Sequence, residues 1–320
     1  MNSRSVTRLS SVFFTGLTGL ATLLILAILA VIIGNVLMQG GTQVSWHFLT
    51  AGIAAKPEAT GDGLGAMFDI DKASVMPMVI GTAARVILMT IFVIPIGVIT
   101  AIYLSEYAPA SSTVTRIIRG AVNNLAGVPS IVFGLFGLGF FIHFIGQDLD
   151  ALLRPGNEEP HWGKPGLLWA SMTLAVMTLP VVIVATEESL RAIPTGLREA
   201  SLALGATKLE TVLKIVLPQA LPGIMTGGIL AISRAAGEVA PILFTGAAYY
   251  MADLPKSVTD QFMDLGYHVF ILSTQSPNIE MTRPILYATV VVLLLLTFTL
   301  NLVAILIRAS IRQRMRLLAH

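Results

Sequence analysis

The stretch PILYATVVVLLLLTFTLNLVAILI, from Pro284 to Ile307, contains no acidic or basic side chain. A helix needs about 20 largely apolar residues to cross the hydrocarbon core of a bilayer, and this stretch is long enough. Five other stretches have the same character, so the sequence predicts an all-α, polytopic membrane protein with six transmembrane helices. The predicted spans are Val12 to Met38, Met76 to Leu104, Gly120 to Ile145, Gly166 to Ala185, Ala220 to Ala247 and Pro284 to Ile307.

The composition of the whole chain fits a bilayer as its solvent. Of 320 residues, 55% are hydrophobic and 12% are charged, whereas soluble domains carry about 25% charged residues. The net charge is only +2, and the basic residues cluster after an apolar run, so we expect no nucleic-acid partner. The absence of cysteine excludes disulfides, thiolate metal sites and a cysteine nucleophile.

The lysines and arginines predict the orientation, because positive charge near the ends of spans is retained in the cytoplasm. Both termini are therefore expected to be cytoplasmic. The first apolar run is too long for a signal peptide and is expected to stay as a transmembrane helix. The predicted parts are a cytoplasmic N-terminus (1–11), a first helix (12–38), an extracytoplasmic loop (39–75), a transmembrane domain (76–308) and a basic cytoplasmic tail (309–320).

The longest predicted inner loop, 186–219, has the pattern of a short helical hairpin. Gly205 marks a helix stop, and Thr207 with Glu210 three residues later predicts a capping box that starts a second helix. Four apolar residues at spacings of three or four predict one apolar stripe on that second helix. They are Leu209, Val212, Leu213 and Val216. A hairpin that only packs against its own membrane domain would have the same pattern.

Within this loop, EASLALGATKLETVLKIVLP from Glu199 to Pro218 resembles the loop signature of ATP-binding-cassette (ABC) importer permeases. Ser201 stands where alanine is usual. The resemblance implies a type I importer permease (MetI-like) fold for 76–308, with 186–219 as the loop that docks in a groove of an ATPase subunit. Gly205 would allow the turn and Glu199 would contact the ATPase. The matching positions are Glu199, Ala200, Gly205, Ile215, Leu217 and Pro218.

The fifth predicted span contains two charged residues four positions apart, Arg234 and Glu238. A charge near the bilayer centre costs at least about 2.5 kcal/mol on insertion scales, so such residues are functional candidates. Gly237 and Pro241 predict an irregular helix, which is tolerated where the backbone faces protein or a water-filled cavity. Arginine binds two oxygens of an oxyanion at once and stays protonated. We expect Arg234 to contact a passing anion, while Glu238 keeps Arg234 from binding that anion permanently. The alternative is a pair in which the two opposite charges only neutralise each other.

Four further polar residues complete the predicted substrate path. Arg85 in the second span either snorkels to the outer interface, which is the preferred interpretation, or lines the path. Asn123 and Asn124 are uncharged polar groups in the third span, and Pro129 followed by Ser130 interrupts its helix. Broken helices with free backbone amides can line an anion path.

Three stretches resemble the phosphate-specific transport permeases: LAGVPSIVFGLFGLGFF (Leu125 to Phe141), SEYAP (Ser105 to Pro109) and SRAAGEVAPILFTGAA (Ser233 to Ala248). The GVPSIVFGLFG form is more similar to the PstA-type than to the PstC-type subunit. The resemblance implies import of inorganic phosphate across the bacterial inner membrane. It also implies three partners: a second phosphate permease, a dimer of ABC ATPase subunits and an extracytoplasmic phosphate-binding protein.

The chain has no GxxxxGK[ST] phosphate loop. We expect a non-catalytic subunit without cofactor or metal, whose partner ATPase binds ATP and Mg²⁺. The alternatives are a permease for sulfate or molybdate, the PstC-type partner permease, a sensor subunit and a secondary transporter. The intramembrane Arg234 and Glu238 argue against a sensor. The loop signature and the lack of an inverted repeat argue against a secondary transporter.

Overall fold

The structure is a computed structural model that describes residues 3–54, 74–109, 111–156, 159–251, 254–276 and 278–318. Within these ranges it is helical, without a β-strand, and a single isolated bridge pairs Ala247 with Phe262. Six helical stretches are long and apolar enough to cross a membrane, which confirms the predicted all-α, polytopic class. They are Phe13–Gly40, Met76–Tyr107, Ser130–Leu153, Leu167–Arg191, Lys208–Gly237 and Thr282–Gln313.

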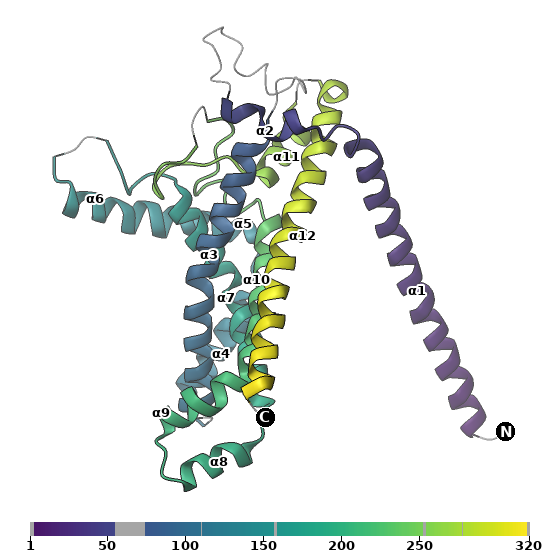
Figure 1. The fold of residues 1–320 in the computed structure, drawn as a ribbon, viewed down its shortest axis with the longest axis vertical. Helices are drawn as coiled ribbons and strands as arrows, with labels where there is room; N and C mark the ends of the chain where they lie inside the picture. Colours follow the sequence, from purple (N-terminus) through teal and green to yellow (C-terminus); the bar gives the residue numbers. More distant parts are fainter. Residues whose placement is uncertain are drawn as a thin grey trace.

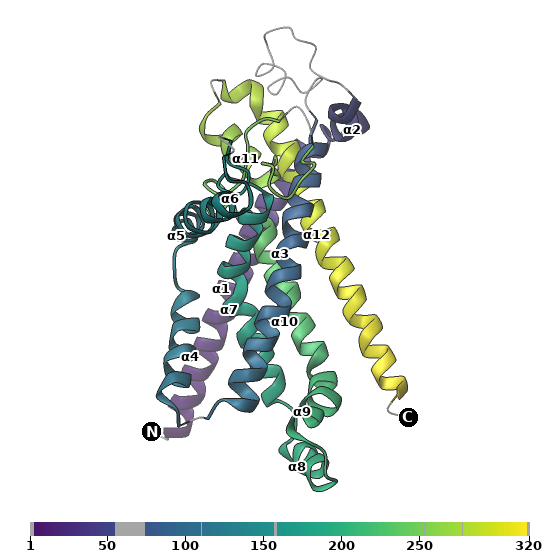
Figure 2. The same ribbon diagram turned by 90° about the vertical axis from the view of Figure 1, so that its left-hand side faces the viewer.

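Four long helices run side by side as a bundle (Figures 1 and 2). They are α3 (Met76–Ile102), α7 (Leu167–Arg191), α10 (Leu217–Gly237) and α12 (Ile279–Leu318). Helix α7 is the central one: it packs against both α3 and α10, and 67% of its most apolar window is buried inside the protein. The packed interior therefore lies around α7, and the outward faces of α3, α10 and α12 remain apolar and exposed.

Small residues bring the central helices close together. A Cβ added at Gly97 of α3 would lie 2.7 Å from Val182 Cγ1 of α7, and one at Gly227 of α10 would lie 2.7 Å from the Cβ of Ala185. Such small-residue contacts are typical of helix pairs in membranes, where close van der Waals packing replaces the hydrophobic effect as the driving force.

Helix α1 (Ser3–Gly40) stands apart from the bundle along most of its length (Figure 1). None of its most apolar window is buried. It meets α12 near Gly40, where an added Cβ would collide with the carbonyl oxygen of Tyr287, so glycine permits the contact. A helix that is apolar on all sides and is not covered by the rest of its chain fits a membrane span.

The third predicted span, Gly120 to Ile145, is wrong as a single helix. The chain forms α4 (Thr113–Leu125), breaks, and continues as α5 (Ser130–Phe136), a π-helical stretch over Gly137–Gly146 and α6 (Gln147–Leu153). Helix α4 runs along the bundle, whereas α5 to α6 runs across it (Figures 1 and 2). Pro129 explains the break, because proline lacks an N–H and disfavours a helical conformation of the residue before it.

The fifth predicted span, Ala220 to Ala247, begins earlier and ends earlier than expected. One continuous helical stretch runs from Lys208 to Gly237. The described residues between it and α11 (Leu265–Thr274) form no helix. Helix formation stops at Gly237, and it does not continue through Pro241, which has no N–H to donate to the Gly237 carbonyl four residues before it.

The two ends of the bundle differ. One end carries α8 (Thr195–Ala203) and α9 (Lys208–Thr211) and lies on the same side as both chain termini (Figure 1); we call it the hairpin end. The far end carries α2 (Trp46–Ala54) and α11. Most of the predicted extracytoplasmic loop 39–75 lies outside the described residues.

The tight contact at Gly97 gives a test of the packing. Gly97→Ala pushes a methyl group into Val182, and overpacking of this kind costs about 1–3 kcal/mol. Thermal unfolding in detergent, followed by tryptophan fluorescence, should show a lower Tm. Gly120→Ala in α4 is the matched control, since its Cβ meets nothing within 4 Å and alanine favours a helix by about 0.5–1 kcal/mol. Equal Tm values for the two variants would contradict the packing.

Candidate translocation and coupling sites

The far end of the bundle contains a buried ion pair. Arg85 of α3 has an exposed fraction of 0%, and its Nε donates to Asp264 Oδ2 at 2.6 Å. The hydroxyl of Thr82 donates to the same oxygen at 2.9 Å. Asp264 is also the N-cap of α11 and accepts the backbone N–H of Tyr267 at 3.1 Å. The interpretation that Arg85 snorkels to an interface is therefore wrong; the carboxylate of Asp264 neutralises it inside the protein.

Arg85 also caps the end of α10. Its Nη1 donates to the carbonyl oxygen of Ala235 at 2.8 Å and its Nη2 to that of Ala236 at 3.2 Å. The last carbonyls of a helix have no partner within the helix and carry partial negative charge. One guanidinium thus satisfies them and joins α3, α10 and the start of α11. Sequence reasoning missed Asp264, although an aspartate directly before an apolar run is a helix N-cap signal.

Arg234 and Glu238 lie beside this cap. The Arg234 Nε is 3.4 Å from Glu238 Oε1, and the two side chains are 41% and 23% exposed. Glu238 is the first residue beyond α10 and has an extended backbone. The pair is therefore formed but open to the surface of this chain, at the end of α10 that Arg85 holds. Its contact with a substrate stays a prediction.

The other predicted path residues lie elsewhere. Asn123 and Asn124 are in the last turn of α4, and Ser130 is the first residue of α5. Asn123 lines a cavity of about 360 Å³ whose lining includes neither Arg234 nor Glu238. The structure therefore does not bring Asn123 into one site with the charged pair.

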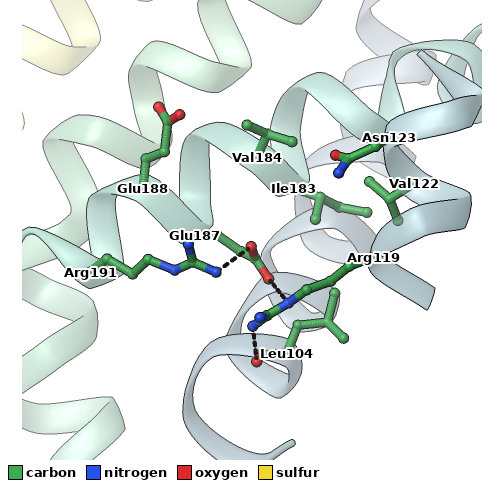
Figure 3. A pocket seen from close by; sticks show the side chains of 9 residues that line it. All are labelled: Leu104, Arg119, Val122, Asn123, Ile183, Val184, Glu187, Glu188 and Arg191. Atoms are coloured by element: carbon green, nitrogen blue, oxygen red, sulfur yellow. Dashed lines mark hydrogen bonds and ion pairs between the residues drawn. The ribbon is translucent and has the colours of Figure 1, made fainter. Parts of the chain in front are cut away.

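This cavity lies near the hairpin end, between α4 and α7, and its centre is a carboxylate between two guanidinium groups (Figure 3). Glu187 Oε2 is 3.2 Å from Arg191 Nη2, and Glu187 Oε1 is 3.5 Å from Arg119 Nε. Arg119 Nη2 also donates to the carbonyl oxygen of Leu104 at 2.7 Å. The lining residues are Leu104, Arg119, Val122, Asn123, Ile183, Val184, Glu187, Glu188 and Arg191.

The predicted hairpin is confirmed in its turn and its cap. Gly205 has a φ of +86°, a left-handed conformation that glycine adopts without strain. Thr207 Oγ1 accepts the backbone N–H of Glu210 at 3.2 Å, and the Thr207 N–H donates to the Glu210 carboxylate at 3.0 Å, which completes the capping box. The segment is therefore locally rigid.

The predicted apolar stripe is only half right. Val212 and Val216 are buried, whereas Leu209 and Leu213 are more than half exposed. The reason is that this arm continues directly into α10, so only the side that faces the bundle is covered. Among the resemblance positions, Glu199, Ala200 and Gly205 are exposed at the tip, and Ile215, Leu217 and Pro218 are half-buried in the continuing arm.

Comparison with known families gives a match over most of the chain. The family described as "Binding-protein-dependent transport system inner membrane component" matches residues 93–317. The matched range contains the hairpin, the cavity and α10.

Proteins with similar sequences are named as permease proteins of transport systems. The chain is 33% identical to "Phosphate transport system permease protein PstA 1" of Mycobacterium tuberculosis over 74% of this chain and 70% of that protein. It is 31% identical to "Probable ABC transporter permease protein YqgI" of Bacillus subtilis over 74% and 71%. It is also 32% identical to "Phosphate transport system permease protein PstC" of Mesorhizobium japonicum over 54% and 55%.

Solved structures share the fold. A bacterial ABC transporter involved in the import of the acidic polysaccharide alginate matches with a TM-score of 0.60 at 14% identity, over 95% of this chain and 99% of that one. The MetNI methionine ABC transporter matches with a TM-score of 0.51 at 20% identity, over 74% and 94%. These likenesses concern the fold alone, and they confirm the predicted type I importer permease architecture.

The buried pair gives a stability test. Arg85→Leu leaves Asp264 charged and unpaired, and breaking a buried pair in this way costs about 3–5 kcal/mol. The double variant Arg85→Leu with Asp264→Asn removes both charges while keeping an N-cap acceptor for α11, and it should recover part of the loss. Thermal unfolding in detergent measures both. A double variant less stable than the single one would contradict the assignment of the pair as the source of the loss.

The capping box gives a local test. Thr207→Ala removes the side-chain acceptor at the start of α9, and loss of an N-cap costs about 1 kcal/mol, equivalent to about fivefold in local opening. Hydrogen exchange at the amide of Glu210 should accelerate by that factor. Thr207→Ser keeps a capping oxygen and is the control. Unchanged exchange in Thr207→Ala would mean that the cap does not hold the hairpin.

Proposed function

The chain belongs to the family of binding-protein-dependent transport system inner membrane components, and we propose that it is the PstA-type permease subunit of an ATP-driven importer of inorganic phosphate. As a permease subunit of an ABC importer it is an integral membrane protein. Identities of 33–39% to PstA proteins of Mycobacterium tuberculosis and Mycobacterium leprae support phosphate as the cargo. The chemistry of Arg234 supports an oxyanion, because a guanidinium donates two hydrogen bonds to one such ligand.

One observation carries the proposed mechanism. The hairpin arm and α10 form a single helical stretch of 30 residues, Lys208–Gly237, with Arg234 in its last turn. At about 1.5 Å per residue this stretch is about 45 Å long, enough to cross a membrane. It includes a π-helical turn at Val212–Val216 and the prolines Pro218 and Pro222, where helices commonly bend. We infer that motion imposed at the hairpin end reaches the charged pair along this one helical path. This arrangement suits alternating access, in which an ATPase moves the hairpin and Arg234 contacts the passing anion.

The remaining components follow from this role. The exposed tip, with Glu199, Ala200 and Gly205, fits the groove of an ATPase subunit, which supplies the ATP and Mg²⁺ chemistry that this chain lacks. That assignment places the hairpin end and both termini in the cytoplasm. A second phosphate permease completes the translocation path, and an extracytoplasmic phosphate-binding protein delivers phosphate to the far end.

The experiment is phosphate uptake into vesicles that contain this chain with its co-purifying partners, with and without internal ATP. Hydrogen bonds to a charged group contribute about 1.5–3 kcal/mol, so Arg234→Gln should lower ATP-dependent uptake by about tenfold or more. Arg234→Lys keeps the charge but loses the planar guanidinium that donates two hydrogen bonds to one anion, so it should give an intermediate uptake rate. Arg154→Gln, an exposed arginine beyond α6, is the control and should match the wild type.

The outcomes separate the parts of the proposal. Wild-type uptake in Arg234→Gln would remove Arg234 from the path. Absent phosphate uptake, with ATPase activity stimulated by sulfate or molybdate, would keep the permease and replace the cargo. Phosphate uptake that needs no ATP would contradict the importer itself.

A further inference from the structure

The segment Tyr103–Tyr107, at the hairpin end of α3, has no role in the function proposed above. It contains the start of the SEYAP motif and is wound as a π-helix, with the Ala108 N–H donating to the Tyr103 carbonyl at 2.8 Å. Short π-helical turns are rare and occur frequently at functional sites. The contacts of this segment with the hairpin and with α4 indicate its role.

The first arm of the hairpin holds the segment through an ion pair. Arg198 of α8 donates to Glu106 Oε1 from Nη2 at 2.8 Å and from Nε at 3.3 Å. The two side chains are only 19% and 10% exposed, so water and salt screen the pair less than a surface pair. Arg198 also donates to the carbonyl oxygens of Leu190 and Ile193 at 2.7 and 2.8 Å, at the end of α7. One side chain therefore joins α8 to both α3 and α7.

The second arm of the hairpin touches the same segment. The Lys208 ammonium, in the first turn of α9, lies 5.1 Å from the centre of the Tyr107 ring. This distance is within the range of a cation–π contact. Neighbouring residues, Glu106 and Tyr107, thus bind the two arms of the hairpin, so the segment is held by both arms.

On its other side the segment is bound to α4. Arg119 donates to the carbonyl oxygen of Leu104 at 2.7 Å and lies 3.5 Å from the Glu187 carboxylate of α7 (Figure 3). Contacts therefore run from the hairpin through Glu106 to the end of α3, and from Leu104 to α4.

We propose that Glu106 is a positioning residue that couples the hairpin to α3 and α4 through Arg198. The inference rests on the proposed function, in which the hairpin is the element that the ATPase moves. Without the Glu106–Arg198 pair the hairpin still docks and ATP is still hydrolysed, but α4 no longer follows.

The test uses spin labels, for which the chain is suited because it has no cysteine. Ile117→Cys in α4 and Ile307→Cys in α12 are exposed positions. The distance between the two labels is measured in the assembled transporter in lipid, with and without ATP and vanadate. The background with native Glu106 should show a change on trapping. Glu106→Gln should lose that change and lower uptake by about tenfold, within the usual range of allosteric coupling, while ATP hydrolysis continues.

Matched variants keep the test decisive. Arg198→Gln should reproduce the Glu106→Gln result, and the double variant should be no worse than either single one, because both act through one contact. Arg154→Gln changes an exposed arginine beyond α6, outside the hairpin, and should match the wild type.

Three results overturn the inference. A label change that persists in Glu106→Gln removes Glu106 from the coupling while leaving the hairpin assignment intact. Uptake and ATP hydrolysis that fall together, in proportion to the amount of assembled complex, would reduce Glu106 to a folding role. An absent label change in the background with native Glu106 would overturn the hairpin as the moving element and, with it, the proposed mechanism.

Discussion

The architecture of the far end depends on the burial of one arginine. A charge inside a membrane domain is tolerated when it is paired and when each of its nitrogens donates a hydrogen bond. Arg85 meets that condition with Asp264 and with the carbonyls of Ala235 and Ala236. Because these partners belong to three different elements, satisfying one guanidinium fixes the position of α3, the end of α10 and the start of α11 together. The pairing of Arg85 therefore also positions the end of α10, beside which Arg234 and Glu238 lie.

Ion pairs between arginines and carboxylates also hold the hairpin end, and one helical stretch connects it to the far end. The continuous helix Lys208–Gly237 begins at the capping box and ends beside Arg85. The stretch contains Pro218, Pro222 and a π-helical turn at Val212–Val216, features at which helices commonly bend, yet it is helical throughout. The two ends are therefore linked through the backbone itself, and Arg198 adds a lateral link to α3 and α7.

Sequence reasoning succeeded where the determinants are local. The apolar length of Pro284 to Ile307 and the spacing of Thr207 and Glu210 depend only on neighbouring residues, and the helix and the capping box are both present. It failed where partners are distant: the partner of Arg85 is 179 residues away, and no local pattern specifies it. The break at Pro129 was visible as a signal, but the direction in which α5 leaves depends on packing against α7, which hydropathy alone does not contain.

Three arginines of the bundle share one arrangement, which Arg234 lacks. Arg85, Arg119 and Arg198 each pair with a carboxylate from another element and also donate to carbonyls at or beyond the end of a helix, where partial negative charge collects. Arg234 differs: within the described chain its contact is the single one to Glu238 at 3.4 Å, no backbone carbonyl receives its donors, and its side chain is 41% exposed. In the proposed function, the open donors of Arg234 are the ones that bind the anion. The carbonyl acceptors of the other three arginines belong to Ala235 and Ala236, to Leu104, and to Leu190 and Ile193.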